Sequence, residues 1–418
     1  MIAFGIRMQS RQKVIKMFTV SDKTALSLLK WSEFFIYFMI ITPIIVLLYQ
    51  EKGITTGDFF LIQGIFLIAT FLFEIPSGYM SDVFSRKKVL LLGSIMWFLA
   101  MVGLFFAYGF WEIMLAEAGL GLAGALFSGT KEAYAYDLLK RMKREKQFLK
   151  ENGSISTYGQ SAGFIAAVIG GSLYAVIGNW VVAIEAMVAF FGVLCILALP
   201  ELQEVRRKVF PETSPWKDVM GIVKMSVKHP EIKWLMLFPA IFGSFTLIMM
   251  WILQPTMEAV GVSVALFGIF VGINQFSRIL FAKYAHKVYE SFGVRKTLYA
   301  CIAAVVIAIA AVFGALFAGA EHMWIVYVMC VIIAIVPACQ KMSSLIFNTL
   351  IHHRIKSSER GTVLSVSSMY ATFISGGMMI LMKPLMDGFG IGWTMAVTLV
   401  MLVAILYPLK KVLAIKEI

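Results

Sequence analysis

The chain has 418 residues, of which 60% are hydrophobic and 15% are charged, and its formal net charge is +13. A soluble globular protein is only about half apolar. So large an apolar excess excludes an ordinary soluble domain and indicates that a lipid bilayer surrounds much of the chain.

Apolar residues gather in long runs along the whole chain. Each run has roughly 20 residues, the length that a helix needs to cross about 30 Å of hydrocarbon. Helices satisfy their own backbone polar groups in lipid, and the sequence lacks the short alternating strands of a β-barrel. We therefore predict an all-α membrane protein with twelve transmembrane helices in two six-helix bundles. The predicted spans are 26–49, 57–80, 88–108, 112–138, 152–176, 179–199, 231–255, 262–285, 295–318, 322–350, 361–384 and 390–410.

A polar, proline-containing stretch separates the sixth span from the seventh and divides the chain into two halves. The halves resemble one another weakly, as parallel repeats related by an axis along the membrane normal would. The predicted organisation is a cytoplasmic amphipathic arm at 1–25, an N-terminal bundle at 26–199, a cytoplasmic linker at 200–230, a C-terminal bundle at 231–410 and a cytoplasmic tail at 411–418.

Lysine and arginine residues are concentrated in alternate loops. They follow the second, fourth, sixth, eighth and tenth spans, whereas the opposite loops offer Lys52 as their clear basic residue. Cytoplasmic loops are the ones enriched in these residues. The pattern predicts a multi-pass protein of the cell (inner or plasma) membrane with both termini in the cytoplasm. Because this orientation explains the net charge, we predict no nucleic-acid partner.

A charged turn between the second and third spans carries the clearest motif. It runs Gly78-Tyr79-Met80-Ser81-Asp82-Val83-Phe84-Ser85-Arg86-Lys87-Lys88. The turn resembles the G-x-x-x-D-x-x-x-R-K signature of the major facilitator superfamily, at the place where that family has it. The resemblance implies the major facilitator fold and a secondary transporter. It also implies a cytoplasmic gate formed by Gly78, Asp82, Arg86, Lys87 and Asp137.

The resemblance further implies partners within this gate. Asp82 would face the start of the eleventh span at Gly361 and Thr362, because a helix N-terminus carries partial positive charge and free N–H groups. Arg86 would reach Asp137 at the end of the fourth span. These contacts would hold the inner end closed and would break when the two bundles rock.

Glycines in the predicted spans indicate close helix packing. In the family, a glycine pair in the fifth span belongs to the antiporter signature, and Gly170-Gly171 matches it without the proline that often precedes the pair. The stretch 128–137 resembles one found in bacterial drug exporters, so the resemblance implies a multidrug efflux antiporter driven by protons. The predicted helix-packing glycines are Gly163, Gly170, Gly171, Gly376 and Gly377, and Gly78 would let the second span approach a neighbour closely.

Ionisable residues at bilayer depth are the main functional candidates, because each costs roughly 2.5–3.5 kcal/mol on insertion scales. Glu33 and Glu74 lie in the cytoplasmic half of the first bundle and are the candidates for proton coupling. A carboxyl group that changes its protonation between two states can carry a proton. The alternative is a permanent structural pair with Lys131. Glu132 is either a cavity residue or a near-surface charge at a helix end.

Arg278 and Lys341 lie on different helices of the second bundle, with no acid nearby in the sequence. Facing one cavity, they would bind an anionic group such as a carboxylate or a phosphate. Alternatively, they pair with acids of the first bundle and form a gate. Glu117 and Glu185 lie nearer the outer face, where we expect a vestibule. The predicted cavity residues are Gln63, Lys131, Glu132, Asn274, Gln275, Arg278, Gln340 and Lys341.

The most probable function from the sequence is a monomeric secondary active transporter that exports a small organic or amphiphilic molecule, anions included, by proton-coupled alternating access. A proton-coupled importer or a lipid flippase of the same fold are the alternatives. A channel would need a repeated polar pore lining, and an enzyme a nucleophile–base pair or a metal cluster. We predict no catalytic residue, no metal site and no cofactor beyond the proton gradient. The expected partners are the small-molecule substrate, protons and the lipid bilayer.

Overall fold

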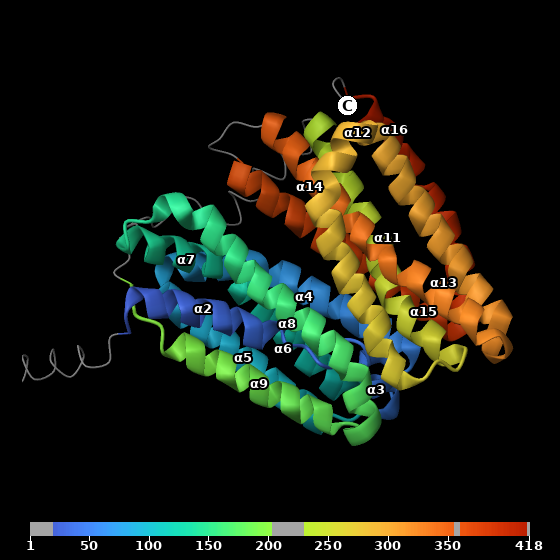
Figure 1. The fold of residues 1–418 in the computed structure, drawn as a ribbon, viewed down its shortest axis with the longest axis horizontal. Coiled ribbons are helices and arrows are strands. Elements are labelled where there is room, and N and C mark those ends of the chain that lie inside the picture. Colours follow the sequence, from blue (N-terminus) through green and yellow to red (C-terminus); the bar gives the residue numbers. More distant parts are fainter. Residues whose placement is uncertain (1–19, 203–229, 355–359, 416–418) are drawn as a thin grey trace, which may run out of the picture.

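The computed structural model of the chain describes residues 20–202, 230–354 and 360–415 (Figure 1). Within these ranges, a few side chains in the helices, among them those of Asp82 and Thr362, are outside the description. Of the predicted arm, linker and tail, residues 1–19, 203–229 and 416–418 lie outside the described residues.

Every regular element in the described part of the chain is helical. The first half contains α2 (Asp22–Tyr37), α3 (Ile45–Glu51), α4 (Thr56–Val83), α5 (Arg86–Phe106), α6 (Phe110–Phe127), α7 (Thr130–Arg141), η1 (Glu145–Gln147), α8 (Phe148–Ile177) and α9 (Trp180–Leu197). The second half contains α11 (Pro230–Ala259), α12 (Val264–Ala318), η2 (Gly319–His322), α13 (Met323–Ile335), α14 (Pro337–Arg354), α15 (Arg360–Val403) and α16 (Leu406–Leu413).

The helices account for all twelve predicted crossings. Among the described residues, nine helical stretches are long and apolar enough to span a membrane. Two of these stretches, Lys287–Ile351 and Val366–Leu413, each contain two predicted spans. The first predicted span is not among the nine stretches, because residues 38–44, between α2 and α3, are not helical and interrupt it. The predicted all-α membrane fold is therefore confirmed.

Proline and glycine divide several spans that the sequence suggested to be continuous. Residues 38–44 are not α-helical, and Pro43 lies among them. Proline removes a backbone donor and clashes with the preceding turn of a helix, which explains this break. The fourth span is divided at Gly129, whose φ is +70°. Glycine tolerates this left-handed conformation because it has no Cβ.

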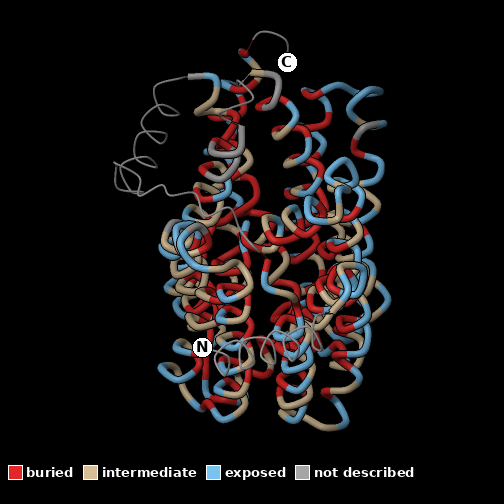
Figure 2. The backbone as a smooth tube through the Cα atoms, turned by 90° about the vertical axis from the view of Figure 1, so that its left-hand side faces the viewer, coloured by how far each residue is buried: buried red, intermediate tan, exposed pale blue. Residues whose placement is uncertain are grey.

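The two halves meet at one end of the molecule and diverge at the other. In Figure 1 they lie close together near α3 and are farthest apart at α7 and α14. The contacts between the halves come mainly from α4 against α15 and from α8 against α12. Figure 2 shows that buried residues run through the interior of both halves, with exposed residues on their outer surfaces. The halves therefore contact each other mainly toward one end of the molecule.

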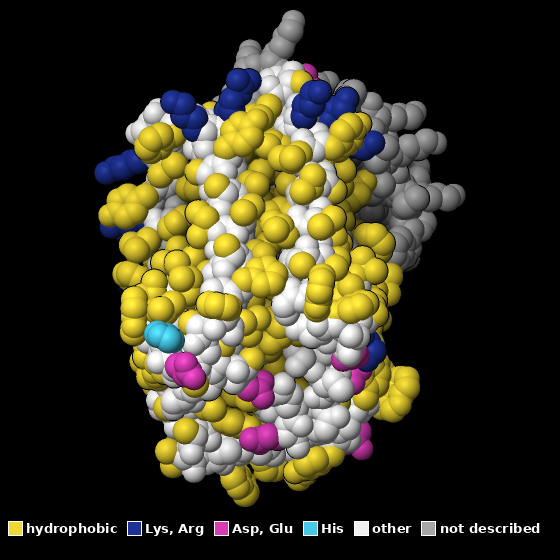
Figure 3. Space-filling view, turned by 90° about the vertical axis from the view of Figure 1, so that its right-hand side faces the viewer, with side chains coloured by type: hydrophobic (Ala, Val, Ile, Leu, Met, Phe, Trp, Pro, Cys, Tyr) yellow, Lys and Arg dark blue, Asp and Glu magenta, His cyan; other side chains and the backbone are white. Residues whose placement is uncertain are grey.

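The surface carries the charge pattern of a membrane protein. In Figure 3 a broad hydrophobic band separates one end that carries mainly lysines and arginines from another that carries mainly aspartates and glutamates. The basic end is the one that the sequence predicts to be cytoplasmic. We use "inner end" for it and "outer end" for the opposite one.

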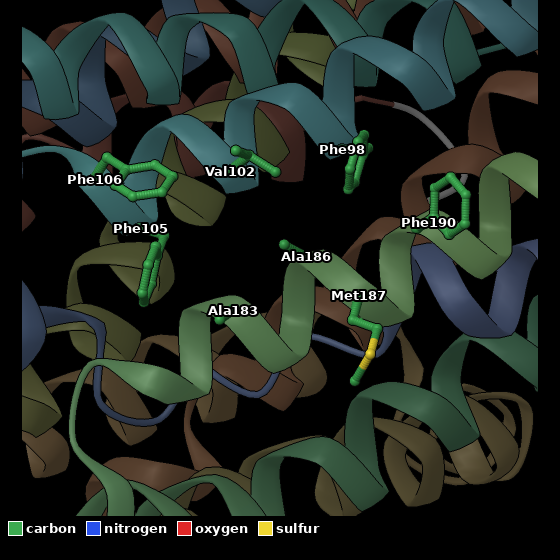
Figure 4. A pocket seen from close by; sticks show the side chains of 8 residues that line it. All are labelled: Phe98, Val102, Phe105, Phe106, Ala183, Ala186, Met187 and Phe190. Atoms are coloured by element: carbon green, nitrogen blue, oxygen red, sulfur yellow. The ribbon is translucent and has the colours of Figure 1, made fainter.

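A groove of about 400 Å³ lies on the surface between α5 and α9 (Figure 4). All eight lining side chains are apolar, and Phe106, Met187 and Phe190 are exposed. An apolar surface of this kind suits contact with acyl chains, because lipid offers no partner for polar groups. The groove therefore belongs to the lipid-facing surface and is not the candidate site.

Candidate functional site: a cavity between the bundles

A cavity of about 310 Å³ is lined by both halves of the molecule. Its first-bundle wall includes Glu33 and Tyr37 of α2 together with residues of α8. Its second-bundle wall includes Gln275 and Arg278 of α12 and Lys341 of α14. The structure thus brings four of the predicted proton-coupling and cavity residues, Glu33, Gln275, Arg278 and Lys341, to one cavity.

An ion pair between Glu33 and Lys131 lies at the first-bundle wall. The ammonium group of Lys131, on α7, donates a hydrogen bond to the Glu33 carboxylate. The Lys131 and Glu33 side chains are only 11% and 13% exposed. The same ammonium lies over the rings of Tyr37 and Phe127, at 5.0 and 4.9 Å from their centroids. Lys131 is therefore already neutralised and held in place.

Arg278 and Lys341 present two positive charges at the second-bundle wall. Among the described residues, no carboxylate is ion-paired with either side chain. Lys341 is exposed and Arg278 is half-buried, and they are close enough for Arg278 to repel the Lys341 ammonium. Two like charges held together with no acid between them create a strong positive potential in the cavity.

The other predicted cavity residues lie elsewhere. The Gln63 side chain donates to Glu117 at 3.2 Å, and the Asn274 side chain donates to the Ala334 carbonyl at 2.9 Å inside the second bundle. Gln340 packs against Gly243 of α11, and Glu132 is exposed on the first turn of α7. None of these four lines the cavity, because each faces its own bundle or solvent.

The second proton-coupling candidate, Glu74, lies on α4 away from this cavity. Its side chain is half-buried, and none of the described lysines or arginines forms an ion pair with it. Glu33 and Glu74 are therefore in different settings, since Glu33 has a cationic partner at the cavity.

The charged motif joins α5 to α7 at the inner end. Arg86 donates to the Asp137 carboxylate and, at 3.0 Å, to the Ala133 carbonyl. Lys87 is half-buried at the start of α5. The Asp82 side chain and its proposed partner at Thr362 lie outside the described side chains. No described atom lies within 4 Å of a Cβ built on Gly78, so the close approach that we expected there is not made in this conformation.

A charge cluster that the sequence analysis missed joins the halves at the outer end. Lys383 of α15 donates to Asp58 of α4 at 2.5 Å and to Asp387 at 2.9 Å. Thr55 donates to Asp387 at 3.0 Å. We call these four residues the outer cluster. Its position shows that the outer end is closed in this conformation.

Glycine contacts reinforce that closure. A Cβ on Gly171 would lie 2.5 Å from the Val264 carbonyl oxygen, and one on Gly268 would lie 2.3 Å from the Ala167 carbonyl oxygen. A Cβ on Gly376 would lie 2.9 Å from Ile68, whereas Gly377 has open space around it. A Cβ on Gly163 would lie 3.7 Å from the side-chain nitrogen of Gln275, at the cavity. The helices of opposite halves therefore touch backbone to backbone at Gly171.

Gly170 makes a comparable contact inside the first bundle. A Cβ on it would lie 2.3 Å from the Ile40 carbonyl oxygen and 2.7 Å from Pro43. The break in the first span therefore rests directly on the backbone of α8.

The vestibule position that we expected for Glu117 and Glu185 is wrong. Both side chains are 3% exposed inside the first bundle. Glu117 accepts hydrogen bonds from the Tyr49 hydroxyl and the Gln63 amide, and Glu185 accepts one from the Ile41 N–H at 2.9 Å. These donors from α3, α4 and residues 38–44 allow the carboxyl groups to be buried.

The sequence matches the Major Facilitator Superfamily over residues 26–380. The chain belongs to the major facilitator superfamily. A curated relative, the uncharacterized transporter BU466 of Buchnera aphidicola subsp. Acyrthosiphon pisum (strain APS), is 34% identical over 122 residues. That match covers 28% of this chain and 29% of the relative, so the chain spans less than a third of that protein's length.

Solved structures of other transporters share the fold. The nucleoside transporter NupG has a TM-score of 0.75 at 15% identity, covering 94% of this chain and 100% of NupG. The D-xylose-proton symporter has a TM-score of 0.69 at 13% identity, covering 94% of this chain and 97% of the symporter. A bacterial homolog of the human lysosomal transporter Spinster has a TM-score of 0.65 at 16% identity, covering 94% and 95% of the two chains.

As a member of the major facilitator superfamily, this multi-pass membrane protein is a transporter, not an enzyme. Because the solved structures share so little sequence identity with this chain, the likeness to them shows its fold alone. Substrate, direction and coupling therefore depend on the chemistry of the chain's own residues.

Proposed function

We propose that this transporter exports small organic or amphiphilic anions across the membrane by proton-coupled alternating access. The observation that carries the proposal is the pair Arg278 and Lys341, two cations without an ion-paired acid among the described residues, facing one cavity of about 310 Å³. A cation at bilayer depth is costly unless it has a partner. An anionic substrate supplies that partner.

The rest of the cavity suits a molecule with one charged end and a less polar body. Tyr37, Met39 and Ile279 provide aromatic and apolar surface, and Gln160 and Gln275 provide hydrogen-bonding groups. Apolar walls with a few placed polar groups are typical of small-molecule sites. A carboxylate or phosphate held by the guanidinium of Arg278 would orient such a substrate.

Proton coupling is proposed for the acids of the first bundle, Glu33 and Glu74. Glu33 is the one that lines the cavity and pairs with Lys131. Protonation of Glu33 would release Lys131 from its ion pair. Because an inward proton gradient drives export only by exchange, we expect Glu33 to bind a proton in the outward-facing conformation and to release it in the inward-facing one.

Alternating access is supported by the asymmetry of the two ends. The outer cluster and the Gly171 contact close the outer end, whereas the bundles diverge at the inner end. Rocking of the halves would break the outer contacts and bring the charged motif of α4 and α5 toward α15.

The proposal is tested by measuring thermal stabilisation of the purified protein with aromatic carboxylates, alkyl phosphates and their neutral or cationic analogues, followed by flux in proteoliposomes. Binding to the native state raises its stability with occupancy. We expect stabilisation by anions only, and its loss in Arg278→Gln and Lys341→Gln. Lys287→Gln, an exposed lysine on α12, is the matched control.

Four results would overturn parts of the proposal. Stabilisation by neutral analogues as strong as by anions would remove the anion assignment. Flux that is independent of the proton gradient would remove proton coupling. Net uptake in right-side-out vesicles would reassign the protein as an importer, and translocation of a fluorescent phospholipid in place of soluble anions would reassign it as a flippase.

A further inference from the structure

The break in the first span is held from both halves of the molecule. From its own half, the Glu185 carboxylate on α9 accepts the Ile41 N–H at 2.9 Å. From the opposite half, Gln254 on α11 accepts the Val46 N–H at 3.1 Å and donates to the Thr42 carbonyl at 2.8 Å. Gln254 is 2% exposed, so water does not compete for these bonds. We call residues 38–44 the unwound segment.

Glu185 belongs to a second, unassigned group of titratable side chains. Glu117 is near enough to act on it electrostatically, and Tyr49 faces both carboxyl groups. On the neighbouring α8, Tyr174 faces Glu51. No described lysine or arginine is hydrogen-bonded to Glu117 or Glu185. The nearby Lys52 ammonium is occupied by the carbonyl groups of α5 and its end, at 3.2 and 2.9 Å.

The hydrogen bonds to the two carboxyl groups differ in a decisive way. One Glu117 oxygen accepts from both Tyr49 and Gln63. One Glu185 oxygen accepts from Ile41, and the Ile40 N–H also faces this carboxyl group, but the other oxygen is buried with no hydrogen-bond partner. Two donors stabilise a carboxylate, whereas a buried charged oxygen without a donor carries a large desolvation cost. Two neighbouring carboxylates without a cation would also repel each other.

We propose that Glu117 and Glu185 form a proton-binding pair that controls the outer end, with one proton held on Glu185 in the outer-closed conformation. Release of this proton to water leaves a Glu185 carboxylate, which attracts the backbone N–H groups of the unwound segment more strongly. The segment moves toward α9 and away from Gln254. The contact between the halves at Gln254 weakens, and the outer end opens.

This inference rests on the proposed proton coupling and adds a place where the proton acts on the gate. The pair is distinct from Glu33, which lines the cavity and has Lys131 as its partner. The unwound segment transmits the change because Thr42 lines the cavity and also bonds to Gln254. A proton at Glu185 is therefore coupled to both the outer end and the cavity wall.

The test measures the distance between spin labels at positions 111 and 389 as a function of pH, without substrate. Trp111 and Phe389 are exposed near the outer ends of the two halves, and the four native cysteines are first replaced by alanine. We expect alkaline pH to raise the ratio of outer-open to outer-closed molecules by at least about fivefold. Glu185→Gln, which mimics the protonated group, stays outer-closed at every pH.

Control variants make the test specific. Glu258→Gln removes an exposed carboxyl from α11 and keeps the pH response of the wild type. Glu185→Asp retains a pH response. Tyr49→Phe removes one donor from Glu117, which then competes for the proton and repels the Glu185 carboxylate less, so the midpoint of the transition moves to lower pH. This last variant also keeps the proposal testable if Glu185→Gln does not fold.

The proposal is overturned if wild-type distances do not change with pH, or if Glu185→Gln responds as the wild type does. It is also overturned if Tyr49→Phe leaves the midpoint unchanged. Because no substrate is present, a pH response together with absent anion flux would reject the proposed function and leave this inference intact. Anion flux with no pH response of the distances would reject this inference and leave the proposed function intact.

Discussion

The Glu33 carboxylate and the Lys131 ammonium form an ion pair that ties α2 to α7 at the edge of the inter-bundle cavity. Their residues are far apart in the sequence, and each is expensive at bilayer depth without the other. The pair therefore ties the C-terminal part of α2 to the first turn of α7 while remaining within reach of a substrate.

Removing one member of this pair should cost more stability than removing both. Glu33→Gln leaves Lys131 without its counter-charge, and we expect a loss of about 3 kcal/mol, the lower end of the range for a broken buried pair. Glu33→Gln combined with Lys131→Gln should recover most of that loss. Thermal melting of the purified wild type, the two single variants and the double variant measures these stability differences. Additive losses in the double variant would show that the pair contributes nothing specific.

The same double variant separates structure from coupling. If Glu33 carries the transported proton, the double variant is stable but loses gradient-driven anion flux in proteoliposomes. If the pair is purely structural, stability and flux recover together. Glu132→Gln, an exposed carboxyl on the same helix as Lys131, should leave both quantities unchanged.

The outer cluster should bias the protein toward the outer-closed conformation. Lys383→Met removes the cation shared by Asp58 and Asp387. Of the two ion pairs, Lys383–Asp58 is the one that crosses between the halves, and a partly exposed pair is worth up to about 1 kcal/mol, so we expect the outer-open population to rise by roughly fivefold. Labels at positions 111 and 389 report the change. Lys296→Met, an exposed lysine on α12, is the control and should have no effect.

The contact at Gly171 should be intolerant of even one methyl group. Gly171→Ala places a Cβ 2.5 Å from the Val264 carbonyl oxygen, so α8 and α12 must separate. We expect transport to fall at least about tenfold, because the outer-closed conformation is lost from the cycle. Gly377→Ala, which meets open space, is the matched control. Equal activity in the two variants would contradict the role of this contact.

The inner motif should require arginine and not merely a positive charge. Arg86 donates to both Asp137 and the Ala133 carbonyl from one terminal guanidinium nitrogen, whereas a lysine side chain is one bond shorter and would hold its ammonium farther from these acceptors. We expect Arg86→Lys and Asp137→Asn to slow gradient-driven flux by about fivefold to tenfold. Lys87→Gln should change flux much less. A normal rate in Arg86→Lys would indicate that charge alone is enough.

Much of the fold was predictable from the sequence, because lipid imposes two simple requirements. A crossing helix must be apolar and roughly 20 residues long, and cytoplasmic loops are basic. These requirements are local, so the runs around Leu90 or Val182 could be recognised without knowing their neighbours. The break at Pro43 was also visible as a residue type, but its consequences depend on partners from other helices.

The site was harder to predict, because pairing at bilayer depth is a property of tertiary structure. Arg278 and Lys341 were singled out by their charge alone, and the structure places both at one cavity. Glu117 and Glu185 carried the same signal, yet their donors come from α3, α4 and the unwound segment, which no spacing in the sequence connects. Asp58 and Lys383, 325 residues apart, were overlooked because each lies near a predicted span end.

The backbone contact between Gly171 of α8 and Val264 of α12 has a thermodynamic consequence. An interface made of glycine and carbonyl groups immobilises no rotamers when it forms, so its closure carries little conformational entropy cost. The two end states can then lie close in free energy without large opposing terms that must cancel. A single proton or one bound anion is enough to reverse such a balance.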